Sequence, residues 1–109
     1  MAGMERELKN ASQGNALVLA VQAVIAANDA YTIRHLGLRC ASERHDDAVY
    51  IFSRVANVDG MKLARRHLEV LLEAKGRIEY SGKPVKPEKA EGLAGHARRF
   101  VEFVRKNLE

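Results

Sequence analysis

Apolar residues recur at every third or fourth position along most of the chain, and glycines and prolines fall in few places. This spacing is typical of amphipathic helices, because the residues of a strand alternate with a period of two. Helices joined by short links pack as antiparallel neighbours. We therefore predict an all-α fold, an up-and-down bundle of four to five antiparallel helices that forms a single domain over residues 1–109. The five predicted helices span residues 4–11, 15–36, 43–55, 61–80 and 87–106.

Residues with known helix-end preferences lie at the predicted boundaries. The first helix is expected to end near residues 12–14, and Asn15 and Gly37 are expected to begin and end the second. Ser42 is expected to cap the third helix, and Pro87 suits the first turn of the last. The predicted core-facing stripes of the last three helices are Ala48, Ile51, Phe52 and Val55; Met61, Ala64, Leu68 and Leu71; and Ala90, Leu93, Ala94, Ala97, Val101 and Val104.

The second predicted helix lacks a polar face in its first three turns. Residues 16–27 are apolar except for Gln22. A helix of this kind has to be covered on all sides, so we expect it to lie at the centre of the bundle. Its short neighbours are too few to bury it in a chain of 109 residues. We therefore predict a homodimer that completes the burial and brings the basic clusters of two copies into one cleft.

Asp29 follows this apolar segment, and its charge needs an explanation. Burying an unpaired carboxylate costs several kcal/mol, so the side chain must find a cation, reach water or take up a proton. Gln22 lies seven residues earlier and therefore shares the same helix face. The cations that follow Asp29 complete the candidate site: Arg34, His35, Arg39, Arg44 and His45.

Three interpretations of this site stay open. In the structural one, Asp29 pairs with Arg39 or caps the third helix near His45, and so holds residues 37–44 against the bundle. In the second, the site binds a ligand without catalysis. In the third, it cleaves RNA without metal: His45 takes the proton of the 2′-hydroxyl, Arg39 holds the phosphate and Asp29 orients the imidazole. The predicted ligand-binding or polar-network residues are Asp29, Gln22, Arg34 and Arg44.

Composition narrows the class of protein. Lys and Arg total 18 against 14 acids, and the resulting net charge of +4 permits nucleic-acid contact without demanding it. Cys40 is the one cysteine, which leaves no internal disulfide or paired-cysteine zinc site, and a reducing, cytoplasmic setting fits best. We predict no cofactor, and no metal site because His35, His67 and His96 lack metal-ligand spacing. The longest apolar run is shorter than the roughly 20 residues of a membrane span, so no membrane partner is expected.

Two stretches of the chain follow a family pattern. Lys75, Ile78, Glu79 and Tyr80 match a motif of Arg or Lys, two residues, a small apolar residue, an acid or His, and Tyr. In the front half, residues 27–49 carry the segments Ala-Asn-Asp-Ala, Leu-Gly-Leu-Arg and Arg-His-Asp-Asp-Ala-Val in order. Both stretches resemble the prokaryotic HEPN (higher eukaryotes and prokaryotes nucleotide-binding) domains. The resemblance covers nearly the whole chain and implies a small helical bundle.

The HEPN resemblance implies several activities. The family includes metal-independent ribonucleases, modules that bind RNA or nucleotides, and toxins or accessory partners of nucleotidyltransferase-like proteins. Its nuclease motif is Arg, four to six residues, then His, where this chain has Lys75 and Glu79. Glutamate does not replace a histidine that titrates near neutrality, so the motif is degenerate. The resemblance therefore implies a module that binds RNA, a nucleotide or a protein partner without efficient catalysis.

Two alternatives stand beside this reading. Arg39 and His45 have five residues between them and so keep the arginine-to-histidine spacing at another place in the chain. The first alternative is accordingly a toxin-like, metal-independent endoribonuclease that uses these two residues. The second is an accessory subunit of a nucleotidyltransferase-like protein.

Overall fold

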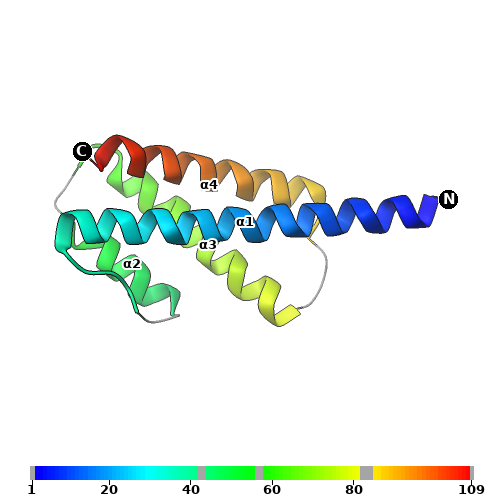
Figure 1. Cartoon of the computed structure of the whole chain (residues 1–109), viewed down its shortest axis with the longest axis horizontal. Coiled ribbons are helices and arrows are strands. Elements are labelled where there is room, and N and C mark those ends of the chain that lie inside the picture. The colour runs from blue at the N-terminus through cyan, green and yellow to red at the C-terminus, as the bar shows by residue number, and fades with distance from the viewer. Residues whose placement is uncertain (1, 42–43, 56–57, 82–84, 109) are drawn as a thin grey trace.

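The computed structural model describes residues 2–41, 44–55, 58–81 and 85–108, and among them the side chains of residues 17–41, 44, 46–55, 58–77 and 85–108. This part of the chain forms α1 (Ala2–Leu36), α2 (His45–Ser53), α3 (Met61–Ser81) and α4 (Pro87–Asn107) (Figure 1). The predicted all-α bundle is confirmed. None of the helices in these ranges is long and apolar enough to span a lipid bilayer.

The two helices predicted at residues 4–11 and 15–36 are one continuous helix, α1. The expected break is wrong, because one glycine inside a helix, here Gly14, costs only about 1 kcal/mol relative to alanine and the helical residues on both sides carry the helix through it. Gly37 does end α1 as predicted. It adopts a φ of +70°, and its N–H donates to the carbonyl oxygen of Ile33 at 2.9 Å.

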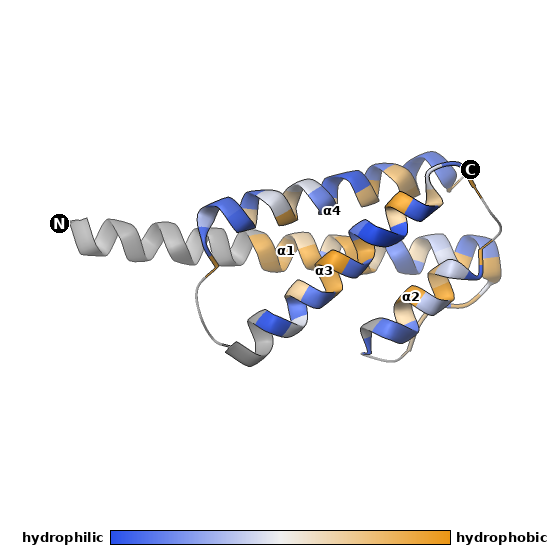
Figure 2. Ribbon diagram, turned by 180° about the vertical axis from the view of Figure 1, so that it is seen from behind, coloured by the Kyte–Doolittle hydropathy of each residue, from blue (hydrophilic) through white to orange (hydrophobic). Residues whose placement is uncertain are grey.

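α1 is covered on one face and not on all sides. Val21, Val24 and Tyr31 are buried against the other helices, whereas Leu19 and Ile33 are 64% and 50% exposed. Hydrophobic residues follow one another along the middle of α1 (Figure 2), so part of its apolar surface faces solvent in the single chain. The prediction that the bundle surrounds α1 is therefore wrong, because α2, α3 and α4 lie along one side of it.

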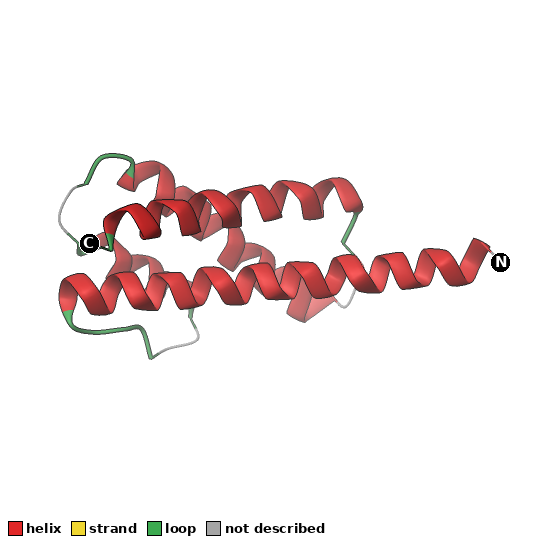
Figure 3. Cartoon of the chain, turned by 45° about the horizontal axis from the view of Figure 1, so that its top comes forward, coloured by secondary structure: helices red, strands yellow, loops and turns green. Residues whose placement is uncertain are grey.

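α3 runs antiparallel to α4, whereas α1 and α4 run parallel (Figures 1 and 3). Leu17 packs with Leu93 at one end of the α1 and α4 pair, and His35 reaches Asn107 at the other. The strict alternation expected of an up-and-down bundle is lost after Gly37, where the chain turns back without forming a helix before α2 begins. α4 makes the most extensive contacts, with α1 and with α3, so these three helices form the body of the bundle.

The starts of α2 and α4 test two predicted boundaries. α2 begins at His45 with Arg44 as its N-cap residue, so the predicted cap at Ser42, which lies outside the described residues, is wrong. Arg44 makes no capping hydrogen bond with its side chain. α4 begins at Pro87 as predicted and ends at Asn107.

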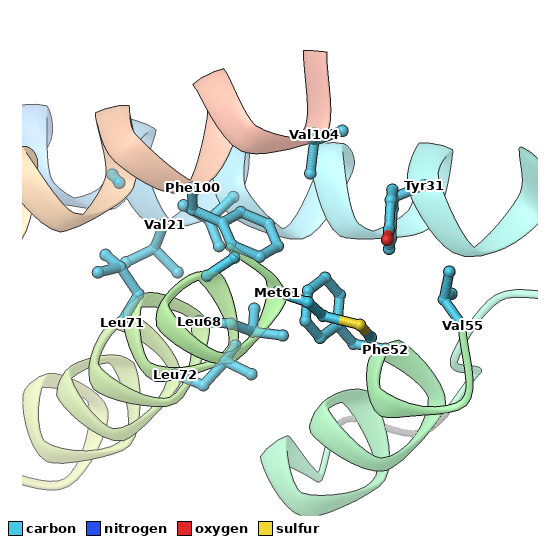
Figure 4. Packing of buried hydrophobic residues seen from close by; sticks show 13 residues of the cluster. Val21, Tyr31, Phe52, Val55, Met61, Leu68, Leu71, Leu72, Phe100 and Val104 are labelled. Atoms are coloured by element: carbon cyan, nitrogen blue, oxygen red, sulfur yellow. The ribbon is translucent and has the colours of Figure 1, made fainter. Parts of the chain in front are cut away.

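The core lies between α1, α3 and α4, and α2 closes one side of it (Figure 4). All four residues of the predicted stripe on α3 are buried. On α4 the predicted Ala94 is exposed, and Phe100, which the predicted stripe omits, is fully buried with its ring 5.6 Å from that of Phe52. The largest fully buried side chains are Tyr31, Phe52, Phe100, Leu68, Leu71, Val24 and Thr32.

Candidate functional site

The predicted network of Gln22 and Asp29 does not form a buried site. Gln22 is exposed and Asp29 is half-buried, although the two lie on one side of α1. The backbone oxygen of Asp29 accepts a hydrogen bond from the Thr32 hydroxyl at 3.3 Å. Among the residues that the structure describes, no ion pair joins the Asp29 carboxylate to Arg39, so the predicted bridge across the α1–α2 connection is not present.

The buried polar groups of α1 lie on the neighbouring face instead. Asn28, Tyr31 and Thr32 are 4%, 0% and 0% exposed. The Tyr31 ring packs against the rings of Phe52 and Phe103, with centroids 5.2 Å and 5.7 Å away. Burial raises the pKa of the Tyr31 hydroxyl above its ordinary value, so this group is neutral in the folded protein.

Arg34 and His35 hold the end of α4. The Nε atom of Arg34 donates to the carbonyl oxygen of Leu108 at 3.1 Å, and Nε2 of His35 lies 2.6 Å from the carbonyl oxygen of Asn107. Carbonyls at a helix C-terminus lack partners within the helix and carry partial negative charge, so cations bind there favourably. Arg34, predicted to belong to the ligand-binding network, therefore ties the last turn of α1 to the last turn of α4.

The described part of the structure does not test the proposed catalytic pair. Arg39 is exposed on the connection after α1, and the side chain of His45 lies outside the described residues. Of the predicted family motif, Lys75 is half-buried on α3, and the side chains of Glu79 and Tyr80 also lie outside the described residues. These residue roles stay predictions.

A pair of histidines that the sequence did not connect lies between α3 and α4. The Nδ1 atoms of His67 and His96 are 2.7 Å apart, so one imidazole donates its N–H to the other. His67 is buried and His96 half-buried. The sequence carries only a weak signal for this pair. Each histidine directly precedes a core residue, Leu68 or Ala97, and so lies at the edge of the apolar stripe of its helix. The two histidines are 29 residues apart along the chain.

The histidine pair holds a proton between its rings. The hydrogen bond needs a neutral acceptor nitrogen, and protonating both rings would set two N–H groups against each other. The pKa of His67 is lowered by burial, and further by the positive charges of His96 and Arg99. The neutral form of His67 is therefore favoured near neutrality.

A groove of about 290 Å³ lies beside this pair, between the start of α3 and the second half of α4. Leu63, Ala64 and Phe103 give it apolar walls, while Arg99 and Lys106 place two cations along it. Its remaining lining residues are Asp59, Gly60, His67, Glu102 and Asn107.

Gly60 joins the groove to the N-terminus of α3. It has a φ of +84°, and its carbonyl accepts the first hydrogen bond of the helix, from the N–H of Ala64 at 2.9 Å. A Cβ at this position would lie 3.8 Å from the ring of Phe103. Gly60 therefore starts α3 beside the groove without a side chain of its own.

This arrangement is suited to binding an organic molecule that carries both phosphate and hydroxyl groups. Arg99 and Lys106 supply donors to phosphate, Phe103 supplies an aromatic ring, and the carboxylates of Asp59 and Glu102 accept hydrogen bonds from hydroxyl groups. Within the described part of the chain, no three His, Cys, Asp or Glu side chains are grouped so as to hold a metal ion. The side chains that line the groove supply charge, an aromatic ring and hydrogen-bond acceptors.

No protein-family model, curated protein or solved structure matches the chain. The HEPN resemblance accordingly stays a prediction from its motifs.

Proposed function

We propose that the chain is a binding module for single-stranded RNA, which it holds in the groove between α3 and α4 without efficient cleavage. The observation that carries the proposal is the juxtaposition of an aromatic ring, Phe103, with two cations, Arg99 and Lys106, around a groove of about 290 Å³. Proteins that bind single strands combine these two elements, since every base has a face that stacks and every nucleotide has a phosphate.

The ring of Phe103 is supported from behind, which suits a stacking platform. It packs against Tyr31 at 5.7 Å and against Phe52 at 6.1 Å, both of which are fully buried. A ring fixed in this way loses little conformational entropy when a base stacks on it. Stacking of one base on an aromatic side chain contributes roughly 1–3 kcal/mol.

Basic residues outside the groove extend the positive surface. Exposed basic residues on α3, next to the groove, offer contacts to the phosphates of neighbouring nucleotides. These residues are Lys62, Arg65 and Arg66. Arg65 also lies 3.8 Å from Glu69, which reduces its contribution.

The histidine pair favours binding over catalysis. Metal-independent cleavage of RNA needs one group to take the proton of the 2′-hydroxyl and another to protonate the leaving oxygen on the far side of the phosphate. His67 and His96 bond to each other through Nδ1 at 2.7 Å and so do not stand on two sides of a bound phosphate. The alternatives of an endoribonuclease using Arg39 and His45, and of a nucleotidyltransferase-like partner, stay predictions from the sequence.

The test is the binding of a labelled, mixed-sequence single-stranded RNA by fluorescence anisotropy between about 50 and 200 mM salt. The double variant Arg99→Gln/Lys106→Gln removes both groove cations. Its matched control, Arg98→Gln/Arg105→Gln, removes the same charge from exposed positions of α4 that do not line the groove. We expect micromolar binding by the native chain, a loss on the order of tenfold in the groove variant and at most about twofold in the control.

The salt dependence separates a groove from diffuse charge. Each single-strand phosphate contact adds about 0.7 to the slope of log affinity against log salt, so the groove variant should lose about 1.4 of that slope and the control almost none. Equal losses in the two variants, or no binding of the native chain at low salt, would overturn the proposal. The same samples run on a gel report cleavage, and specific cleavage would favour the endoribonuclease alternative.

Self-association belongs to this proposal, because α1 leaves apolar side chains exposed in the single chain. A homodimer would present two grooves to one RNA strand and raise the affinity by linking two weak contacts.

A further inference from the structure

The exposed side of α1 carries a regular apolar stripe. Leu19, Ala23, Ala26, Ala30 and Ile33 are all exposed and follow one another at intervals of four, three, four and three residues. We call these five residues the α1 stripe. That spacing is the heptad spacing of helices that pack along their length, so the stripe stays on one line and faces a single neighbour.

The opposite face of α1 already belongs to the core. Val21, Val24 and Tyr31 are buried there, so the α1 stripe is a second apolar face and not the edge of the first. Within it, Leu19 is 64% exposed and Ile33 is 50% exposed, and the neighbouring Val18 is 48% exposed. Exposed apolar residues that adjoin one another on a protein surface mark an interaction site, whereas single ones do not.

We propose that the α1 stripe packs against the α1 stripe of a second copy of this chain, with the two helices antiparallel and related by a two-fold axis near Ala26. This extends the homodimer named under the proposed function and specifies its interface. It does not depend on RNA binding.

The order of residues in the α1 stripe is what identifies the partner. Leu19 and Ile33 are bulky and lie at the ends, with three alanines between them. The pattern therefore reads almost the same in both directions. An antiparallel copy places Leu19 of one helix beside Ile33 of the other, and the small alanines let the two backbones approach closely at the centre.

The polar residues beside the stripe favour the antiparallel direction. Gln22 and Asp29 lie on the same flank of the α1 stripe, at nearly equal distances along the helix from Ala26. In an antiparallel pair, the Asp29 carboxylate of one copy faces the Gln22 amide of the other, which donates hydrogen bonds. In a parallel two-fold pair, this flank of one copy lies on the opposite side of the interface from the same flank of the other, so Asp29 would not meet Gln22. The two residues that the sequence grouped into one network are thus joined across the interface.

The length of the stripe sets the strength of the dimer. From Leu19 to Ile33 the helix rises about 21 Å at 1.5 Å per residue. A single helix pair of this length buries less than the roughly 800 Å² per partner of a standard stable interface, so we expect a dissociation constant on the order of 10 µM.

Sedimentation of the full chain without RNA, from about 1 to 200 µM, tests the proposal directly. The expected result is a shift from the 12.1 kDa monomer to twice that mass as concentration rises. Ala26→Glu sets two carboxylates against each other at the two-fold axis and should leave a monomer up to the highest concentration. The matched control is Ala94→Glu, at an exposed position inside α4, which should dimerise like the native chain.

Cross-linking decides the orientation. In a Cys40→Ser background, chains carrying Leu19→Cys mixed with chains carrying Ile33→Cys should join to each other with a short bismaleimide, and each should join poorly to itself. Circular dichroism melting confirms that the variants stay folded. A native chain that is monomeric at 200 µM, an Ala26→Glu variant that dimerises normally, or Leu19→Cys chains that join mainly to themselves would overturn the proposal. Because no RNA is present, none of these results bears on the RNA-binding test.

Discussion

Replacing Tyr31 by phenylalanine should stabilise the protein, which is an unusual expectation for a fully buried residue. Tyr31 is 0% exposed, and its hydroxyl makes no hydrogen bond in the described part of the chain. The ring itself is well packed, with His35, Phe52 and Phe103 around it. Phenylalanine keeps all of these ring contacts and removes the one polar atom that lost its water on folding.

The size of the effect follows from the cost of that desolvation. A buried hydroxyl without a partner costs about 1–3 kcal/mol in proteins, so Tyr31→Phe should raise the free energy of unfolding by about that amount. In a domain of this size, each kcal/mol corresponds to a rise in Tm of about 4 °C or more. Tyr50 is 66% exposed, and Tyr50→Phe is the matched control, with an expected change close to zero.

Urea denaturation near neutral pH measures both variants, and a second series at high pH adds an independent check. The pKa of Tyr31 is raised by burial, so below the unfolded-state pKa of about 10 the hydroxyl is neutral in both states and its titration does not affect stability. Above that pH the unfolded chain releases the proton first, and the native fold loses stability. The native chain should therefore lose stability in that range more steeply than Tyr31→Phe. A free energy of unfolding that falls by more than about 0.5 kcal/mol in Tyr31→Phe would refute the reasoning, because it would mean that the hydroxyl makes a favourable hydrogen bond.

Two further predictions concern the groove. The pKa of His67 is lowered by burial and by its cationic neighbours, so the unfolded chain takes up protons first and the native fold weakens as pH falls. His67→Gln should therefore reduce the loss of stability between about pH 7.5 and 5.5. Urea denaturation in which the free energy of unfolding falls equally with pH in both proteins would contradict this. Gly60→Ala should lower the free energy of unfolding by about 1–2 kcal/mol, because alanine is strained at a φ of +84°. Gly92→Ala, within α4 and with open space around its Cα, should instead raise the free energy of unfolding by up to about 1 kcal/mol. Thermal melts in which both variants shift in the same direction would show that the turn carries no strain.

Periodicity was enough to place α3 and α4, and it failed at particular points for physical reasons. The stripe from Met61 to Leu71 repeats at three and four residues and is buried as predicted. At Gly14 the local preference for a turn is too weak to interrupt α1, which continues as a helix on both sides. The direction of α4 relative to α1 depends on the path of the chain after Gly37, and helical spacing carries no information about that path.

The candidate site was harder to predict, because it depends on how two helices are aligned. One residue changes the direction of a helical side chain by about 100°, so Asn28 is buried while its neighbour Asp29 is only half-buried. His67 and His96 meet only because α3 and α4 run antiparallel in one register. No spacing along the chain encodes that register, whereas the individual positions of Gln22 and Asp29 on one side of α1 were readable from the sequence.

The most direct test of RNA binding in the groove is to follow the backbone amide signals of the ¹⁵N-labelled protein by NMR while single-stranded RNA is added. We expect the largest shifts at the groove, at Gly60, Leu63 and Phe103. Shifts centred instead on the connection that carries Arg39, or no shifts at low salt, would contradict this expectation.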